Sequence, residues 1–90
     1  MTKIYIYCLF DSTKAESFKG VYSSLKAAHR DALRLANRGD CQVVMIDVNG
    51  QYVEPTLVNL RNTFKGVCDQ TVGYRTNRSI VTIYKTRLKE

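Results

Sequence analysis

Lys-Gly-Val-Tyr-Ser-Ser, residues 19–24, precedes a helical pattern over residues 25–38 that ends at Gly39. The hydroxyl of Ser23 or Ser24 can accept a hydrogen bond from an N–H group that the first turn leaves unpaired. Glycine supplies the left-handed residue that closes many helices. An apolar stripe at helical spacing consists of Leu25, Ala28, Ala32, Leu35 and Ala36. The stretch therefore predicts a loop that leads into a capped helix, with extended segments on either side.

The outer side of this helix carries basic residues at successive i+4 positions, namely Lys26, Arg30, Arg34 and Arg38. Such a ridge is most often a solvated helix face. The functional alternative is a surface that follows phosphates or binds an acidic partner. Asp31 is expected to pair with Arg34, which dilutes the positive charge of the ridge.

Length and composition indicate one folded domain over residues 1–90. The apolar fraction of 44% favours a folded chain over a disordered one. No apolar run approaches the ~20 residues of a membrane-spanning helix, and the N-terminus lacks the pattern of a signal peptide. We therefore expect a cytoplasmic protein that does not associate with membranes.

The segments around the first helix predict strands. Residues 3–10 alternate with apolar side chains in both sets, which favours a central strand. Residues 11–19 are polar and predict a loop. Residues 42–48 predict a buried strand, which continues through a type I′ turn at Asn49-Gly50 into a short return strand over residues 51–53.

A second helix is predicted after this hairpin. Pro55 suits its first turn, and Gly66 suits its end. Its buried side consists of Leu57, Leu60 and Phe64.

The C-terminal third predicts two further strands. Residues 67–75 form the weaker one, residues 76–79 suit a turn, and residues 79–88 alternate regularly. The predicted order is β-α-β-β-α-β-β, an α+β fold with a small, mostly antiparallel sheet and both helices on one face. The first six elements match the order of a ferredoxin-like fold, and the C-terminal hairpin is additional.

Few residues suit catalysis or metal binding. The single histidine, His29, is interpreted as a surface or boundary residue rather than a catalytic one. Cys8, Cys41 and Cys68 lack C-x-x-C spacing and are expected to be reduced structural thiols. No dinucleotide-binding, P-loop or zinc-protease motif occurs. The sequence favours a binding protein without metal or cofactor, and a nuclease that uses scattered carboxylates is the enzymatic alternative.

Positive charge is concentrated in the C-terminal third. The formal net charge is +6. Residues 1–60 carry 7 basic and 6 acidic side chains, whereas residues 61–90 carry 7 basic and 2 acidic ones. A clustered positive field attracts nucleic acid or an acidic protein surface.

Tyrosines accompany this charge on the predicted strands. Tyr5 and Tyr7 share one face of the first strand, and Tyr84 lies on the last strand. If these faces coincide and are open to solvent, the rings can stack on bases of RNA or single-stranded DNA. The cations expected to contact phosphates are Arg75, Arg78, Lys85 and Arg87, with Lys3 nearby. The alternative is that the tyrosines lie at the edge of the core with their hydroxyls in water.

Residues 4–9, Ile-Tyr-Ile-Tyr-Cys-Leu, resemble the first-strand motif of RNA-recognition domains. The companion glycine-and-aromatic motif of those domains is expected on the third strand. Residues 51–53 do not carry it, so the chain is not assigned to that family.

The tyrosine-rich first strand and residues 20–24, Gly-Val-Tyr-Ser-Ser before Ala27 and Ala28, resemble the start of small phage-encoded accessory proteins. The resemblance implies a non-enzymatic protein that binds nucleic acid or a host factor in the cytoplasm of the infected cell. The leading hypothesis is binding of RNA or single-stranded DNA. The alternative is an inhibitor or adaptor that binds an acidic host protein through the helix ridge or the C-terminal hairpin. A homodimer formed through an exposed strand is compatible with either.

Overall fold

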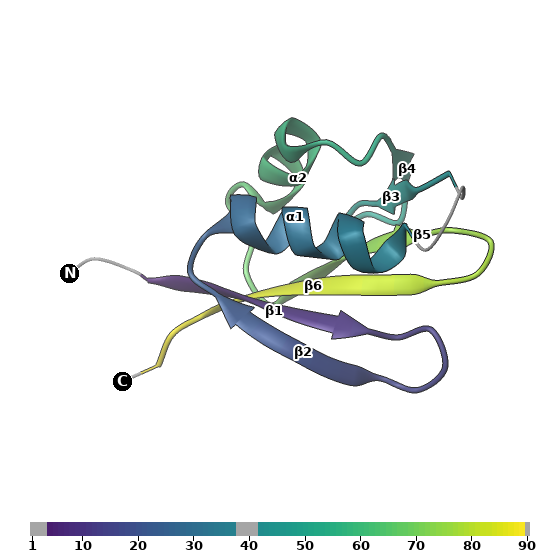
Figure 1. The fold of residues 1–90 in the computed structure, drawn as a ribbon. Coiled ribbons are helices and arrows are strands. Elements are labelled where there is room, and N and C mark those ends of the chain that lie inside the picture. Colours follow the sequence, from purple (N-terminus) through teal and green to yellow (C-terminus); the bar gives the residue numbers. More distant parts are fainter. Residues whose placement is uncertain (1–3, 38–41, 90) are drawn as a thin grey trace.

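A computed structural model describes residues 4–37 and 42–89 of the chain. Lys3, Arg38, Gly39 and Cys41, which entered the sequence predictions, lie outside the described residues. A six-stranded antiparallel sheet carries two helices on one face (Figure 1). The elements are β1 (Tyr5–Asp11), β2 (Ser17–Tyr22), α1 (Leu25–Ala36), β3 (Val44–Ile46), β4 (Tyr52–Val53), α2 (Leu57–Phe64), β5 (Gln70–Arg75) and β6 (Ile80–Arg87).

The strands lie side by side in the order β2-β1-β6-β5-β3-β4. All neighbouring pairs are antiparallel, so the predicted α+β class with both helices on one face is confirmed. The ferredoxin-like order is not confirmed, because β6 lies between β1 and β5 and the chain has an additional strand, β2. The C-terminal hairpin is therefore at the centre of the sheet.

The prediction of a loop over residues 11–19 is wrong in part, because residues 17–22 form the strand β2. It pairs with β1, and Tyr7 lies opposite Tyr22 while Phe10 lies opposite Phe18. The rings of Phe10 and Phe18 meet edge to face with centroids 5.6 Å apart. A bulge in this pairing, beside Leu9 and Phe10, interrupts the alternation, which is why the sequence pattern does not predict a strand here.

The helix α1 begins after Ser24, whose side chain accepts a hydrogen bond from the backbone N–H of Ala27. Its buried residues include three alanines, Ala28, Ala32 and Ala36, none of which is exposed. Small side chains let the helix lie close to the sheet. The predicted N-cap and stripe are confirmed. The predicted end at residue 38 is wrong, because the α-helix ends at Ala36 with Asn37 as its C-cap.

The turn between β3 and β4 differs from the predicted type I′ turn. The backbone N–H of Gly50 bonds to the Asp47 carbonyl, and Gly50 has a φ of 81°. Among the described residues only Asp69, besides Gly50 and Gly66, has a positive φ, so Asn49 does not adopt the left-handed conformation that type I′ requires. The connection is a type I turn followed by a left-handed glycine.

The helix α2 follows Thr56, its N-cap, and buries Leu60 and Phe64 as predicted. Pro55 precedes the cap by one residue rather than standing in the first turn. Gly66, with a φ of 75°, follows the C-cap as expected.

The core lies between the sheet and the helices. Its largest fully buried side chains are Tyr74, Phe64, Leu9, Met45, Leu60, Ile83, Val72 and Val81. Among residues 4–37 and 42–89, no helix is long and apolar enough to span a membrane.

Candidate functional site: the open face of the sheet

The two faces of the sheet have different surroundings. Residues that lie opposite each other on neighbouring strands point to the same face. Leu9, Ile83 and Val72 occupy one such cross-strand row and are buried under the helices. The adjacent row of Cys8, Tyr84 and Thr71 therefore points to the other face, which no helix covers within the described residues (Figure 1).

We call this second surface the open face. It is mostly apolar and is rich in β-branched and aromatic side chains. Its members are Ile6, Cys8, Phe10, Phe18, Val21, Val44, Ile46, Tyr52, Thr71, Gly73, Arg75, Ile80, Thr82, Tyr84 and Thr86.

Several large apolar side chains of the open face are strongly exposed. The exposed fractions are 57% for Phe18, 54% for Val21 and 65% for Tyr52. Ile4 and Leu88, each one residue beyond a strand end, extend the same alternating rows and are also exposed. Because monomeric proteins seldom expose contiguous apolar patches of this kind, the face is a candidate binding surface.

The tyrosines expected to stack on bases do not share a face. Tyr84 lies on the open face opposite Cys8, whereas Tyr7 pairs with Lys85 on the helix side. The Tyr7 ring packs near Phe64, with centroids 6.2 Å apart. Burial raises the pKa of Tyr7. The register of β6 against β1 therefore puts Tyr84 on the face of the sheet opposite to that of Tyr7.

Lys85 is not placed to contact a phosphate on the surface. It is only 7% exposed, and its Nζ donates a hydrogen bond to the carbonyl of Phe64 at 2.6 Å. The ammonium also lies 4.5 Å from the centroid of the Tyr5 ring. A cation at the last carbonyl of α2 interacts favourably with the negative end of the helix dipole. In this structure Lys85 and Tyr5 stabilise the end of α2 together.

The remaining predicted cations are exposed but dispersed. Arg75 lies on the open face, Arg78 lies in the turn before β6, and Arg87 lies at the end of β6. Arg75 lines a shallow pocket of about 260 Å³ with Tyr52, and the other lining residues are Gln42, Val44, Thr76 and Asn77.

An acidic side chain stands at the opposite end of β5 from Arg75. The hydroxyls of Thr86 and Tyr84 donate hydrogen bonds to Oδ1 of Asp69, at 2.7 and 2.9 Å. The bonds from Thr86 and Tyr84 lower the pKa of the Asp69 carboxyl, and Lys89 and Arg87 add smaller effects in the same direction. The bond to Asp69 raises the pKa of Tyr84. Charged groups thus lie around the open face rather than at its centre.

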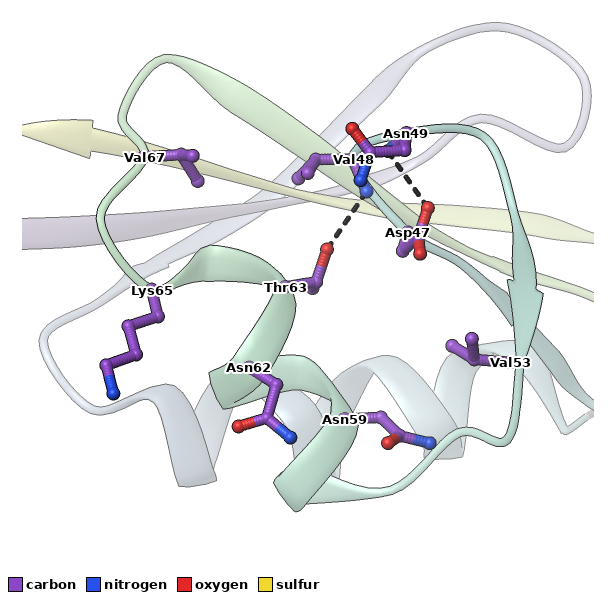
Figure 2. Close-up of a pocket in the computed structure, with 9 residues that line it drawn as sticks. All are labelled: Asp47, Val48, Asn49, Val53, Asn59, Asn62, Thr63, Lys65 and Val67. Atoms are coloured by element: carbon purple, nitrogen blue, oxygen red, sulfur yellow. Dashed lines mark hydrogen bonds between the residues drawn. The ribbon is translucent and has the colours of Figure 1, made fainter.

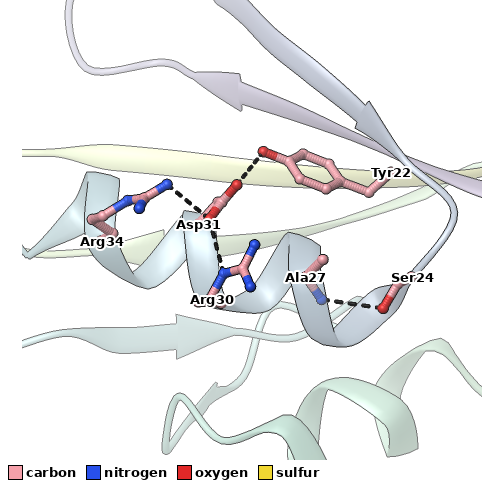
Figure 3. A network of polar contacts seen from close by, with 6 residues as sticks. All are labelled: Tyr22, Ser24, Ala27, Arg30, Asp31 and Arg34. Carbon is pink, nitrogen blue, oxygen red and sulfur yellow. Dashed lines mark hydrogen bonds and ion pairs between the residues drawn. The ribbon is translucent and has the colours of Figure 1, made fainter.

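The described members of the basic ridge, Lys26, Arg30 and Arg34, lie on α1, on the helix side of the sheet (Figure 1). Arg34 Nη2 and Arg30 Nε bond to Oδ1 of Asp31 at 2.8 and 3.2 Å, so the predicted Asp31–Arg34 pair is confirmed (Figure 3). The Tyr22 hydroxyl donates to Asp31 Oδ2 at 2.6 Å, and this bond is the main cause of the lowered pKa of Asp31. Lys26 is exposed. Asp31 neutralises part of the ridge and ties β2 to α1.

A polar pocket of about 450 Å³ lies between α2 and the β3–β4 hairpin (Figure 2). Several of its polar groups bond within the protein. Thr63 Oγ1 accepts from the N–H of Val48, and Asp47 Oδ1 accepts from the N–H groups of Asn49 and Gln51. The bond to Thr63 holds the hairpin against α2, and the bonds to Asp47 close the hairpin turn, so these groups have a structural role.

The prediction that His29 is a surface or boundary residue is wrong, because the side chain is buried. His29 is 9% exposed, and its Nδ1 lies 2.6 Å from the hydroxyl of the buried Tyr74. Burial lowers the pKa of His29. Among the described cysteines, Cys8 and Cys68 are free thiols. In the described part of the chain, no three His, Cys, Asp or Glu residues gather where they could hold a metal ion.

Sequence reasoning missed the open face as a unit. The signal was present in residues 3–10, where both alternating sets are apolar. That pattern correctly predicts a central strand. A central strand with two apolar faces can be buried on both sides, or it can be buried on one side and form a binding surface on the other. Comparisons with protein-family models, with curated proteins and with solved structures gave no match.

Proposed function

We propose that the protein is a non-enzymatic binding protein whose open face docks an apolar surface of another protein, bordered by acidic groups. The observation that carries the proposal is the exposure of apolar side chains. Seven large apolar side chains are exposed among the described residues, and six of them, all except Val58 on α2, lie on the open face or extend its rows. Burial of such side chains drives protein association.

The distribution of charge on the open face suits an interface. Interface cores are poor in charged residues and rich in aromatic ones, and their rims are polar. The middle of the face holds Cys8, Thr82 and Tyr84, while Arg75 and Asp69 lie toward opposite ends of β5. The largest exposed rings, Phe18 and Tyr52, lie on the outer strands β2 and β4.

Charge also indicates the chemistry of the partner. The net charge of +6 makes two copies of the chain repel each other, so a second copy is the less favourable occupant. Exposed cations include Lys19 on the outer strand β2, Arg78 in the turn before β6 and Lys89 after β6. An acidic rim on the partner would match them and accelerate association. The resemblance to phage accessory proteins adds that this partner is a host protein.

Site-specific photocrosslinking tests the proposal. A photoreactive residue replaces Val21 on the open face or, as the matched control, Val58, which is 64% exposed on α2. In nuclease-treated bacterial lysate, we expect position 21 and not position 58 to crosslink to an acidic protein. The yield should fall as salt rises, because screening weakens the attraction between rims. Equal crosslinking at both positions, or a product of two copies of this chain, would contradict the proposal.

Binding of RNA or single-stranded DNA on the same face is the second candidate. It is favoured by the pocket where the exposed Tyr52 ring and the Arg75 guanidinium meet the amides of Gln42 and Asn77. A ring and a guanidinium suit stacking on a base, and amides suit its hydrogen-bonding edge.

Mobility shifts across a salt series separate the two candidates. If nucleic acid is the ligand, Arg75→Gln should weaken binding and reduce its salt dependence, whereas Arg61→Gln on α2 should change it little. Absence of a shift at low salt excludes this candidate and leaves protein docking.

A further inference from the structure

We infer that the pocket beside α1 and the start of α2, on the helix side of the sheet, binds a small carboxylate that carries an apolar body. The inference is independent of the function proposed for the open face. The pocket has a volume of about 570 Å³, within the ~300–1,000 Å³ range of ligand sites. Its lining consists of Ser24, Lys26, Ala27, His29, Arg30, Leu33 and Leu57.

The tautomer of His29 follows from its partner. Tyr74 is completely buried, and the only hydrogen bond of its hydroxyl within residues 4–37 and 42–89 is the one to His29 Nδ1. The hydroxyl proton therefore has to point to Nδ1, since a buried donor without an acceptor is costly. Burial raises the pKa of Tyr74, which keeps this proton in place. With Nδ1 as acceptor, the neutral ring carries its own proton on Nε2.

The free side of the imidazole reaches the pocket. No described residue bonds to His29 Nε2. Yet no fully buried side-chain nitrogen or oxygen in the described part of the chain lacks a partner. Nε2 must therefore meet solvent, and the pocket that His29 lines is where it does so. The Nε2–H group is therefore a fixed donor that faces the pocket.

The polar groups around this donor call for an anion. Lys26 and Arg30 line the same pocket and offer only hydrogen-bond donors. Asp31 occupies Nε of Arg30 and leaves the terminal nitrogens of the guanidinium available. Ser24 Oγ already accepts from Ala27, so its hydroxyl proton is a further donor.

The rest of the lining is apolar and sets the body of the ligand. Ala27, Leu33 and Leu57 come from α1 and α2 and offer no polar side-chain atoms. Inorganic phosphate would leave these surfaces uncovered, whereas an aromatic or branched aliphatic carboxylate would bury them. A carboxylate accepts from Nε2–H and from the flanking cations at once.

An NMR titration of the full-length, ¹⁵N-labelled protein tests the inference with three probes. Benzoate carries both ring and charge, benzyl alcohol the ring alone, and inorganic phosphate the charge alone. We expect benzoate to shift the His29 Nε2 signal and the amides of Ala27 and Leu33. Benzyl alcohol and phosphate should each bind more weakly than benzoate by a factor of roughly ten or more, because benzyl alcohol lacks the charge and phosphate lacks the ring.

Two charge-matched variants locate the site without disturbing the buried histidine. Lys26→Gln should weaken benzoate binding severalfold, and Arg61→Gln, an equal loss of charge outside the pocket, should leave it unchanged. Three results would overturn the inference: no shift at Ala27 and Leu33, a phosphate affinity equal to that of benzoate, or equal effects of the two variants.

Discussion

At the residue scale, Lys85 shows how a side chain expected to serve a ligand can serve the fold. Lys85 lies opposite Tyr7, on the face of β6 that the helices cover. There its ammonium bonds to the Phe64 carbonyl and lies over the Tyr5 ring. A charged hydrogen bond of this kind contributes about 1.5–3 kcal/mol.

We expect Lys85→Ala to lower the free energy of unfolding by about 2 kcal/mol, because the bond, the ring contact and the packing of the stem are lost together. Urea denaturation measures the change. Arg87→Ala, two residues along the same strand but exposed, should stay within about 0.5 kcal/mol of the parent. Equal stability of Lys85→Ala and the parent would refute the structural role.

His29 and Tyr74 give stability a defined pH window. The pKa of His29 is lowered from 6.5 in the folded protein. The contribution of His29 to the free energy of unfolding is therefore complete above pH 6.5. It declines as the pH falls, because the unfolded chain then takes up a proton more readily than the folded chain. The pKa of Tyr74 is raised from 10.0, so its contribution is complete below pH 10 and is lost as the pH rises.

We therefore expect the urea concentration at the denaturation midpoint to decrease as the pH is lowered from 6.5 to 5. Because His29 is the only histidine, His29→Gln should abolish this slope while the alkaline decline persists. Urea midpoints between pH 5 and pH 11 measure both limbs. An acid slope that survives in the variant would assign it to another group.

At the scale of elements, the β3–β4 connection depends on one left-handed residue. Gly50 has a φ of 81°, and a Cβ added there would meet no atom within 4 Å. The cost of a side chain is therefore purely conformational, roughly 1–2 kcal/mol.

We expect Gly50→Ala to lower the free energy of unfolding by roughly 1–2 kcal/mol, as measured by thermal denaturation. Gly20→Ala in β2 is the matched control. Gly20 is not among the residues with positive φ, and its added Cβ would make ordinary contact with the Tyr22 ring at 3.5 Å. A larger loss at Gly20 than at Gly50 would contradict the turn assignment.

At the scale of the whole molecule, the described helices cover one face of the sheet, and no other described element covers the second face. The helices bury the rows of Leu9, Val72 and Ile83, and the opposite rows stay open (Figure 1). Apolar groups that are already exposed contribute little to the stability of the isolated protein, so they can be replaced at small cost.

We expect the double variant Phe18→Ser, Val21→Ser to bind less of the fluorescent dye ANS than the parent, with stability within about 1 kcal/mol. Dye fluorescence under native conditions and urea denaturation are the two measurements. Val58→Ser, on the exposed side of α2, should leave dye binding nearly unchanged. Equal dye binding by the parent and the double variant would mean that the open face is not the principal apolar surface.

The sequence by itself determined the elements that local rules specify. Capping and periodicity act within a few residues, and they predict a serine cap at Ser23 or Ser24, the alanine stripe, the second helix and the strand over residues 79–88. The structure places the cap at Ser24. Only the tertiary structure decided which faces meet. It paired β1 with β6, so that Tyr84 lies opposite Cys8 and away from Tyr7, and it buried Lys85 and His29. Strand order and register are set by contacts between distant segments, and a shift of one residue exchanges the two faces, so a local pattern cannot say which side of a strand awaits a partner.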